Sequence, residues 1–182
     1  MYPVRAAAPC CTGILSSPPT IRTATESDAR AIAEVVARAI GVGLRGFLPE
    51  ERMPSAEIGW VVERLGADDV EVVVAELDGE VAGVAIYGSS RDEDAPDSAG
   101  ELRVLHVVPE HWRRGVGRAL VDRALAALLE MGYREATLWS AADNQRANAF
   151  YAAWGFARDG ADQRRARFGN VLEVRYRIAL VA

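Results

Sequence analysis

The stretch Pro109–Leu120 combines two glycines with several arginines in a pattern that could bind an anion. Gly115 and Gly117 stand where an extended segment passes into a helical one, and the first amides of a helix have no partner within it. Those N–H groups and the helix dipole attract phosphate, which can approach closely because glycine has no Cβ. Positive charge is added by three arginines, Arg113, Arg114 and Arg118. The spacing predicts a diphosphate site, although a tight turn without a ligand has the same Gly-x-Gly pattern.

Residues that are missing exclude several other phosphate-binding classes. All 21 basic residues are arginine, whereas a P-loop NTPase, a pyridoxal-phosphate Schiff-base enzyme and a kinase each need a lysine. A dinucleotide-binding turn is excluded because Leu120 stands where the third glycine is needed. The two histidines and the adjacent Cys10 and Cys11 match no metal-ligand spacing, so we expect no metal site.

Two further residues could move protons. Tyr151, in the segment Asn144–Phe156, could give a leaving group a proton or a hydrogen bond. Its position beside Phe150 and Trp154 is also consistent with aromatic packing on a helix. Glu101, at the start of a predicted strand, could accept a proton, or could be an exposed glutamate beside an acidic loop.

Together the two segments resemble the GNAT (Gcn5-related N-acetyltransferase) superfamily. The family's turn follows a strand ending in Leu-x-Val-x-Pro, as at Leu105–Pro109, and contains Gly-x-Gly/Ala, as at Gly115–Gly117. Its C-terminal motif, Asn-x-x-Ala-x-x-Phe-Tyr-x-x-x-Gly-Phe, is present at every named position of Asn144–Phe156. The resemblance covers about residues 20–180. It departs from the family at Trp112, where arginine or glutamine is usual.

The resemblance implies acetyl-CoA as the acyl donor. Its pyrophosphate would lie on the amides of Arg113–Arg118, and its pantetheine arm along the strand edge Leu105–Val107. Asn144 would contact it near the point where neighbouring strands separate. The residues implied in binding are Leu105, His106, Val107, Arg113, Arg114, Gly115, Val116, Gly117, Arg118, Asn144 and Tyr151.

The implied reaction is direct attack of a primary amine, on a small molecule or a protein, on the thioester. Tyr151 matches the family's general acid, and Glu101 lies at the offset of the base in histone-type members. His106 and a water chain are the other candidates for the base. Trp139 stands where ribosomal-protein N-terminal acetyltransferases usually carry glutamate, which counts against that branch. The alternative function is a catalytically idle acyl-CoA-binding or interaction module on the same fold.

Sequence periodicity predicts the elements that position these residues. Strands are predicted over residues 21–24, 70–77, 81–87, 102–108, 136–139 and 171–180, with a short strand near Phe156. Helices are predicted over about 25–40, 55–65, 115–131 and 144–154. Asp78-Gly79 indicates a tight hairpin between the second and third strands.

This order predicts an α/β (α+β) fold in one domain. The sheet is expected to be mixed and mostly antiparallel, with six or seven strands and four flanking helices. The resemblance implies that it is splayed between the fourth and fifth strands. Residues 1–19 are predicted to be a flexible tail, and residues 20–182 the N-acetyltransferase domain.

Composition restricts the partners and the setting. The net charge of −5 disfavours nucleic acid and anionic membranes, and no apolar run approaches the roughly 20 residues of a membrane span. A cytoplasmic, bacterial protein is expected. The acidic loop 91–97 could attract a cationic amine, or could simply be solvated. A homodimer, common in the family, is an open alternative to a monomer.

Overall fold

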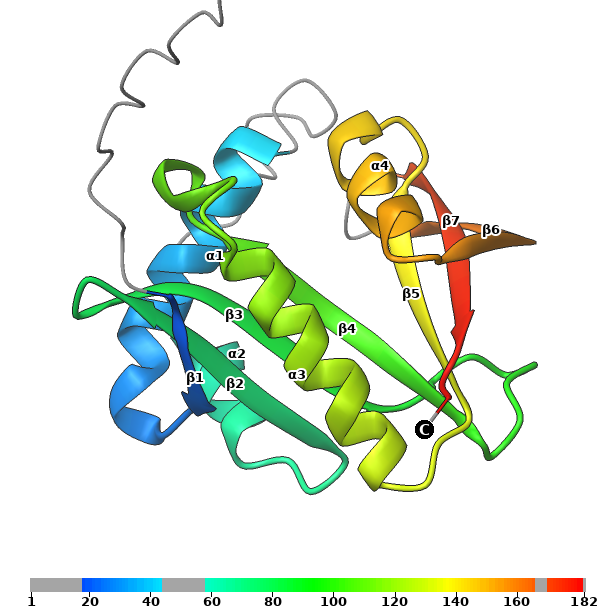
Figure 1. Cartoon of the computed structure of the whole chain (residues 1–182), viewed down its shortest axis with the longest axis horizontal. Helices are drawn as coiled ribbons and strands as arrows, with labels where there is room; N and C mark the ends of the chain where they lie inside the picture. The colour runs from blue at the N-terminus through cyan, green and yellow to red at the C-terminus, as the bar shows by residue number, and fades with distance from the viewer. Residues whose placement is uncertain (1–17, 44–57, 166–169, 182) are drawn as a thin grey trace, which may run out of the picture.

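The computed structural model describes residues 18–43, 58–165 and 170–181. Seven strands form one sheet in the order β1-β2-β3-β4-β5-β7-β6 (Figure 1). The strands are β1 (Thr20–Thr23), β2 (Val70–Leu77), β3 (Glu80–Ser89), β4 (Ala99–Val107), β5 (Glu135–Ala141), β6 (Ala157–Arg165) and β7 (Val171–Ala179). The helices are α1 (Ala29–Gly43), α2 (Gly59–Leu65), α3 (Val116–Glu130) and α4 (Gln145–Ala153), with short 3-10 turns η1 (Glu26–Asp28) and η3 (Pro109–His111).

The predicted fold class is confirmed, with differences at element ends. Asp78 and Gly79 both have positive φ, 55° and 83°, as the hairpin between β2 and β3 requires. The strand predicted near Phe156 is nine residues long in the structure. Its mostly polar residues pair with β7. Only β7 has the apolar residues from which a strand can be predicted. The proposed start of the second helix and the tail 1–17 lie outside the described residues.

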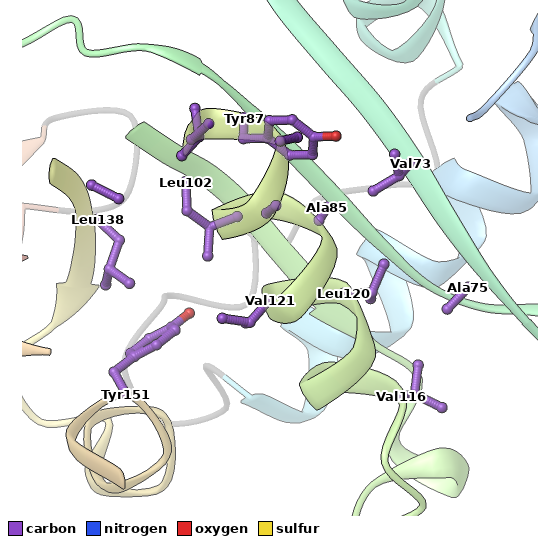
Figure 2. Packing of buried hydrophobic residues seen from close by; sticks show 14 of the residues in the cluster. Val73, Ala75, Ala85, Tyr87, Leu102, Val116, Leu120, Val121, Leu138 and Tyr151 are labelled. Atoms are coloured by element: carbon purple, nitrogen blue, oxygen red, sulfur yellow. The ribbon is translucent and has the colours of Figure 1, made fainter. Parts of the chain in front are cut away.

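Helices cover both faces of the sheet. On one face, the apolar stripe of α3, which includes Leu128, packs against Val73, Ala85 and Leu102. Figure 2 shows Leu120 of α3 on this face of the sheet. On the other face, α1 packs against alternate residues of the same strands, such as Val72, Val74 and Val84. This division follows from the period-2 alternation of side chains along each strand. None of the described helices is long and apolar enough to cross a membrane.

The sheet opens between β4 and β5. These strands run parallel and pair only over Ala99↔Glu135, Gly100↔Ala136 and Glu101↔Thr137. Beyond that point β4 continues beside β3, and β5 continues beside β7. The β4 backbone beyond Glu101 therefore has no strand on its β5 side among the described residues. Figure 1 shows β4 and β5 diverging from this point toward α4.

Candidate active site

The turn between β4 and α3 lies at the mouth of this opening. Trp112 fixes the end of β4 to the turn, because its indole Nε1 donates to the carbonyl of Val107 at 2.8 Å. The chain then takes left-handed conformations at Arg113 (φ 61°) and Gly115 (φ 84°), and α3 begins at Val116. The resulting reversal directs the first turn of α3 back toward β4.

The first amides of α3 are free. Ala119 makes the first bond of the helix, donating to the carbonyl of Gly115 at 2.9 Å. No side chain caps the helix, and the N–H groups of residues 116–118 have no acceptor in the described part of the chain. Three unpartnered donors at the positive end of a 15-residue helix form a site for an anion.

The two glycines of the turn have different roles. Gly115 needs its lack of a Cβ for its backbone conformation, and no heavy atom lies within 4 Å of the position a Cβ would take. At Gly117, a Cβ would lie 3.6 Å from Phe150 Cζ and 3.7 Å from Val107, which is ordinary contact. The packing therefore tolerates a small side chain at position 117. Such a side chain would, however, reduce the room for an anion at the adjacent amides.

The three arginines of the turn differ in their surroundings, and Arg113 is exposed to solvent. Arg114 is engaged within the protein, with Asp78 at 2.8 Å and the imidazole of His111 at 2.9 Å. Arg118 is exposed, lies 3.9 Å from Asp122 and faces the ring of Trp154. Together with Phe150, Ala153 and Trp154, Arg118 lines a hollow between the start of α3 and α4.

Tyr151 is buried on the α3 side of the sheet. Its ring packs against Phe150, Phe156 and Tyr176. The hydroxyl points away from α4 toward Val121 in Figure 2. It forms no hydrogen bond with any described residue, and burial raises its pKa to about 12. A neutral phenol with an unused donor is therefore held between α4 and the core.

Glu101 is only 2 % exposed and lies where the pairing of β4 and β5 ends. Its carboxylate accepts from Arg91 three times: Nη2 at 2.6 Å, Nε at 2.9 Å and the backbone N–H at 3.2 Å. Arg103 Nε lies 3.9 Å from Oε2. Both carboxylate oxygens are thus occupied by an arginine that starts the acidic loop.

His106 and Asn144 occupy two other predicted positions. His106 pairs with Val84 across the sheet and so lies on the α1 side, where burial lowers its pKa to about 4. Asn144 is the N-cap of α4, and its side-chain oxygen accepts from the N–H of Ala147 at 3.2 Å. The motif asparagine therefore has a structural role that uses this oxygen and leaves its amide nitrogen for other contacts.

A profile of the Acetyltransferase (GNAT) family matches residues 42–156, well over half of the chain. The chain belongs to the GNAT family. Among solved structures, the PaiA N-acetyltransferase of Thermoplasma acidophilum, in complex with coenzyme A, superposes with a TM-score of 0.73. That likeness is at 18% identity and covers 87% of this chain and 98% of the other, so it shows a shared fold.

Curated GNAT relatives match different shares of their own length. An uncharacterized N-acetyltransferase of Archaeoglobus fulgidus is 37% identical over 52% of this chain and 63% of that protein. A mycothiol acetyltransferase of Cellulomonas flavigena is 34% identical over 66% of this chain and 37% of the relative. An aminoglycoside N(6')-acetyltransferase of Stenotrophomonas maltophilia is 30% identical over 79% of this chain and 89% of the relative. The chain thus spans less than two thirds of the first two.

The acidic loop of this GNAT chain is bound to the C-terminal strands. Arg175 of β7, 4 % exposed, donates to Asp92 at 3.1 Å, Asp94 at 2.6 Å and Asp159 at 2.7 Å. Asp92 also accepts from the indole of Trp139 at 2.9 Å. Hydrogen bonding from Arg175 lowers the pKa of Asp94 to about 2. Two of the loop's four carboxylates are therefore neutralised internally.

Sequence reasoning missed the arginines that organise the site. Arg91 pairs with Glu101, Arg175 holds the loop, and Arg146 stacks on Trp112. Arg146 lies within the motif Asn144–Phe156, but at a position where the family motif names no residue type. Arg175 had no signal at all, because its partner Asp92 lies 83 residues away along the chain.

Proposed function

We propose that the chain is an acetyl-CoA-dependent N-acetyltransferase that transfers the acetyl group directly to a primary amine. The observation that carries the proposal is the meeting of three features at one opening. These are the free amides at the start of α3, the β4 edge left without a neighbouring strand, and the unpartnered hydroxyl of Tyr151. Family membership supplies the chemistry that links them.

The diphosphate of the donor binds at the free amides of residues 116–118, with Arg113 and Arg118 adding charge. The pantetheine arm then follows β4 beyond Glu101, where backbone donors and acceptors are available to its two amides. The bound donor thereby occupies the opening and presents its thioester between the two faces of the sheet.

The amine nitrogen forms a bond to the thioester carbonyl carbon, and the carbon–sulfur bond breaks. Tyr151 donates a hydrogen bond to the departing sulfur. Because an ordinary thiol has a pKa near 8.5, complete proton transfer from a phenol with a pKa of about 12 is unfavourable. Tyr151 thus stabilises the thiolate, which takes its proton from water after release.

The attacking amine must first lose a proton, because an alkyl ammonium has a pKa near 10. Glu101 lies on the opposite face of the sheet from Tyr151, since its neighbour Leu102 packs on the α3 side. Arg91 already occupies three of the roughly four lone-pair positions of the Glu101 carboxylate, so Glu101 is poorly placed to act on the amine directly. A water chain from the α1 side is therefore the route we propose for the proton.

The acceptor is proposed to be a small primary amine. The aminoglycoside and mycothiol acetyltransferases among the relatives support this class, because both names denote small-molecule acceptors. The acidic loop contributes less attraction for a cation than its composition indicates, because Arg175 already binds Asp92 and Asp94.

A thiol-release assay tests the proposal. Purified protein with acetyl-CoA should release coenzyme A thiol when supplied with one class from a panel of aminoglycosides, polyamines, amino-sugar thiols, amino acids and peptides. Saturable coenzyme A binding without thiol release across the panel would favour the idle-module alternative. The same result would contradict the enzymatic proposal.

A further inference from the structure

Arg146 of α4 reaches across to the turn that precedes α3. Its Cζ lies 3.5 Å from the centroid of the Trp112 ring, which is a close stacking contact for a guanidinium on an aromatic face. Trp112 is itself fixed, because its Nε1 donates to Val107. The two residues therefore join α4 to the end of β4 across the mouth of the opening.

This contact is the first of three along one face of α4. Residues 146, 150 and 154 are spaced four apart, so they lie on the same side of the helix. Phe150 approaches Gly117, and Trp154 faces Arg118 at 5.4 Å. The face of α4 that carries Arg146 is thus the face turned toward the free amides of α3.

Within residues 18–43, 58–165 and 170–181, no carboxylate pairs with the Arg146 guanidinium. It forms no hydrogen bond or ion pair with any residue that the structure describes, although Arg22, Arg91 and Arg175 are all paired with carboxylates. Its Nη2 lies 3.4 Å from the position a Cβ would take at Gly43, so the end of α1 also borders it. Arg146 is exposed, and partial desolvation of its guanidinium on the Trp112 ring lowers its pKa. No described residue accepts from its N–H donors, and its helix face is turned toward the amides of residues 116–118.

We propose that Arg146 binds the diphosphate of the acyl-CoA donor, and that Trp112 is the residue that positions it. The proposal rests on the function proposed above. Stacking holds the planar guanidinium by its face and leaves its edge, which carries the five N–H donors, directed outward. Those donors and the amides of residues 116–118 then bind one ligand from two sides.

Calorimetric titration of three ligands into Arg146→Met tests this assignment. Dephospho-coenzyme A keeps the diphosphate of coenzyme A but lacks its 3′-phosphate, and pantetheine lacks all phosphates. We expect the Kd of coenzyme A and of dephospho-coenzyme A to rise about tenfold. Binding of pantetheine, measured by competition, should stay within about twofold. Arg123→Met, which removes a charge from α3 at its Glu130 pair, is the matched control and should change none of the three.

A second variant separates binding from folding. Trp112→Phe keeps an aromatic face and should retain most of the affinity, whereas Trp112→Leu should match the loss in Arg146→Met. Equal weakening of all three ligands by Arg146→Met, or no weakening at all, would overturn the assignment and leave Arg146 as a tie between α4 and the turn. If the unmodified protein binds no coenzyme A, the proposed function itself fails, which this design reports separately.

Discussion

Tyr151 combines burial with an unused hydroxyl, so its chemistry depends on staying protonated. With a pKa of about 12, the phenol keeps its proton throughout the pH range in which an acetyltransferase is assayed. Tyr151→Phe should lower kcat by about 10- to 100-fold, because the departing thiolate loses a hydrogen-bond donor. The Kd of coenzyme A should change less than about twofold. An unchanged kcat, or a tyrosine-dependent fall in kcat between pH 8 and 9, would contradict this role.

Variants of Glu101 and Arg91 can distinguish a structural role of the Glu101 carboxylate from a catalytic one. If the carboxylate serves to hold Arg91 and the acidic loop, Glu101→Gln and Arg91→Met should lower the melting temperature and kcat/KM together. A base would behave differently: Glu101→Gln alone would reduce kcat, and the rate would recover as the pH rises. We expect the first pattern, measured by thermal unfolding and pH–rate profiles of both variants.

His106 makes stability depend on pH. Its pKa is about 4 in the folded chain and about 6.5 when exposed, so between these values the unfolded chain binds more protons. Stability contributed by neutral His106 is therefore present above pH 6.5 and is lost as the pH falls toward 4, by at most about 3 kcal/mol. His106→Leu should flatten that part of the curve in denaturant unfolding. Identical slopes in the two proteins would show that His106 is already solvated.

At the scale of elements, the role of the turn before α3 in coenzyme A binding can be tested by comparison with the hairpin turn between β2 and β3, for which no ligand is proposed. Gly115 and Gly79 have nearly the same φ, 84° and 83°, and neither has a heavy atom within 4 Å of a built Cβ. Gly115→Ala and Gly79→Ala should each cost about 1 kcal/mol of folding free energy. Only Gly115→Ala should also weaken coenzyme A binding, because the new methyl stands beside the free amides. Equal affinities in the two variants would remove the turn from the site.

Elements with local signals were predictable, and elements that depend on distant partners were not. The hairpin at Asp78-Gly79 and the stop of α4 before Gly155 follow from backbone preferences of single residues, and the structure has both. The length of β6 was missed because its residues are mostly exposed and polar, so only pairing with β7 defines it. Trp112 shows the same limit, because its stacking partner lies in another helix.

At the scale of the molecule, the opening between β4 and β5 follows from long-range pairing. The sequence alone predicts the strands but contains no pattern that ends their pairing at Glu101 and Thr137. Only the family resemblance implied it. Neither the sequence pattern nor the family resemblance predicted that Arg175 anchors the acidic loop. Three carboxylates from two segments converge on this one buried guanidinium. Long-range ion pairs of this kind leave no periodic trace in a sequence.

The central claim is that the free amides at the start of α3 hold the diphosphate of an acyl-CoA donor at the mouth of this opening. Calorimetric titration of coenzyme A into the whole protein tests it most directly. The account predicts saturable binding at one site per chain, with affinity that falls as salt is added. Titration without saturable heat, confirmed by the absence of thermal stabilisation at millimolar coenzyme A, would contradict it.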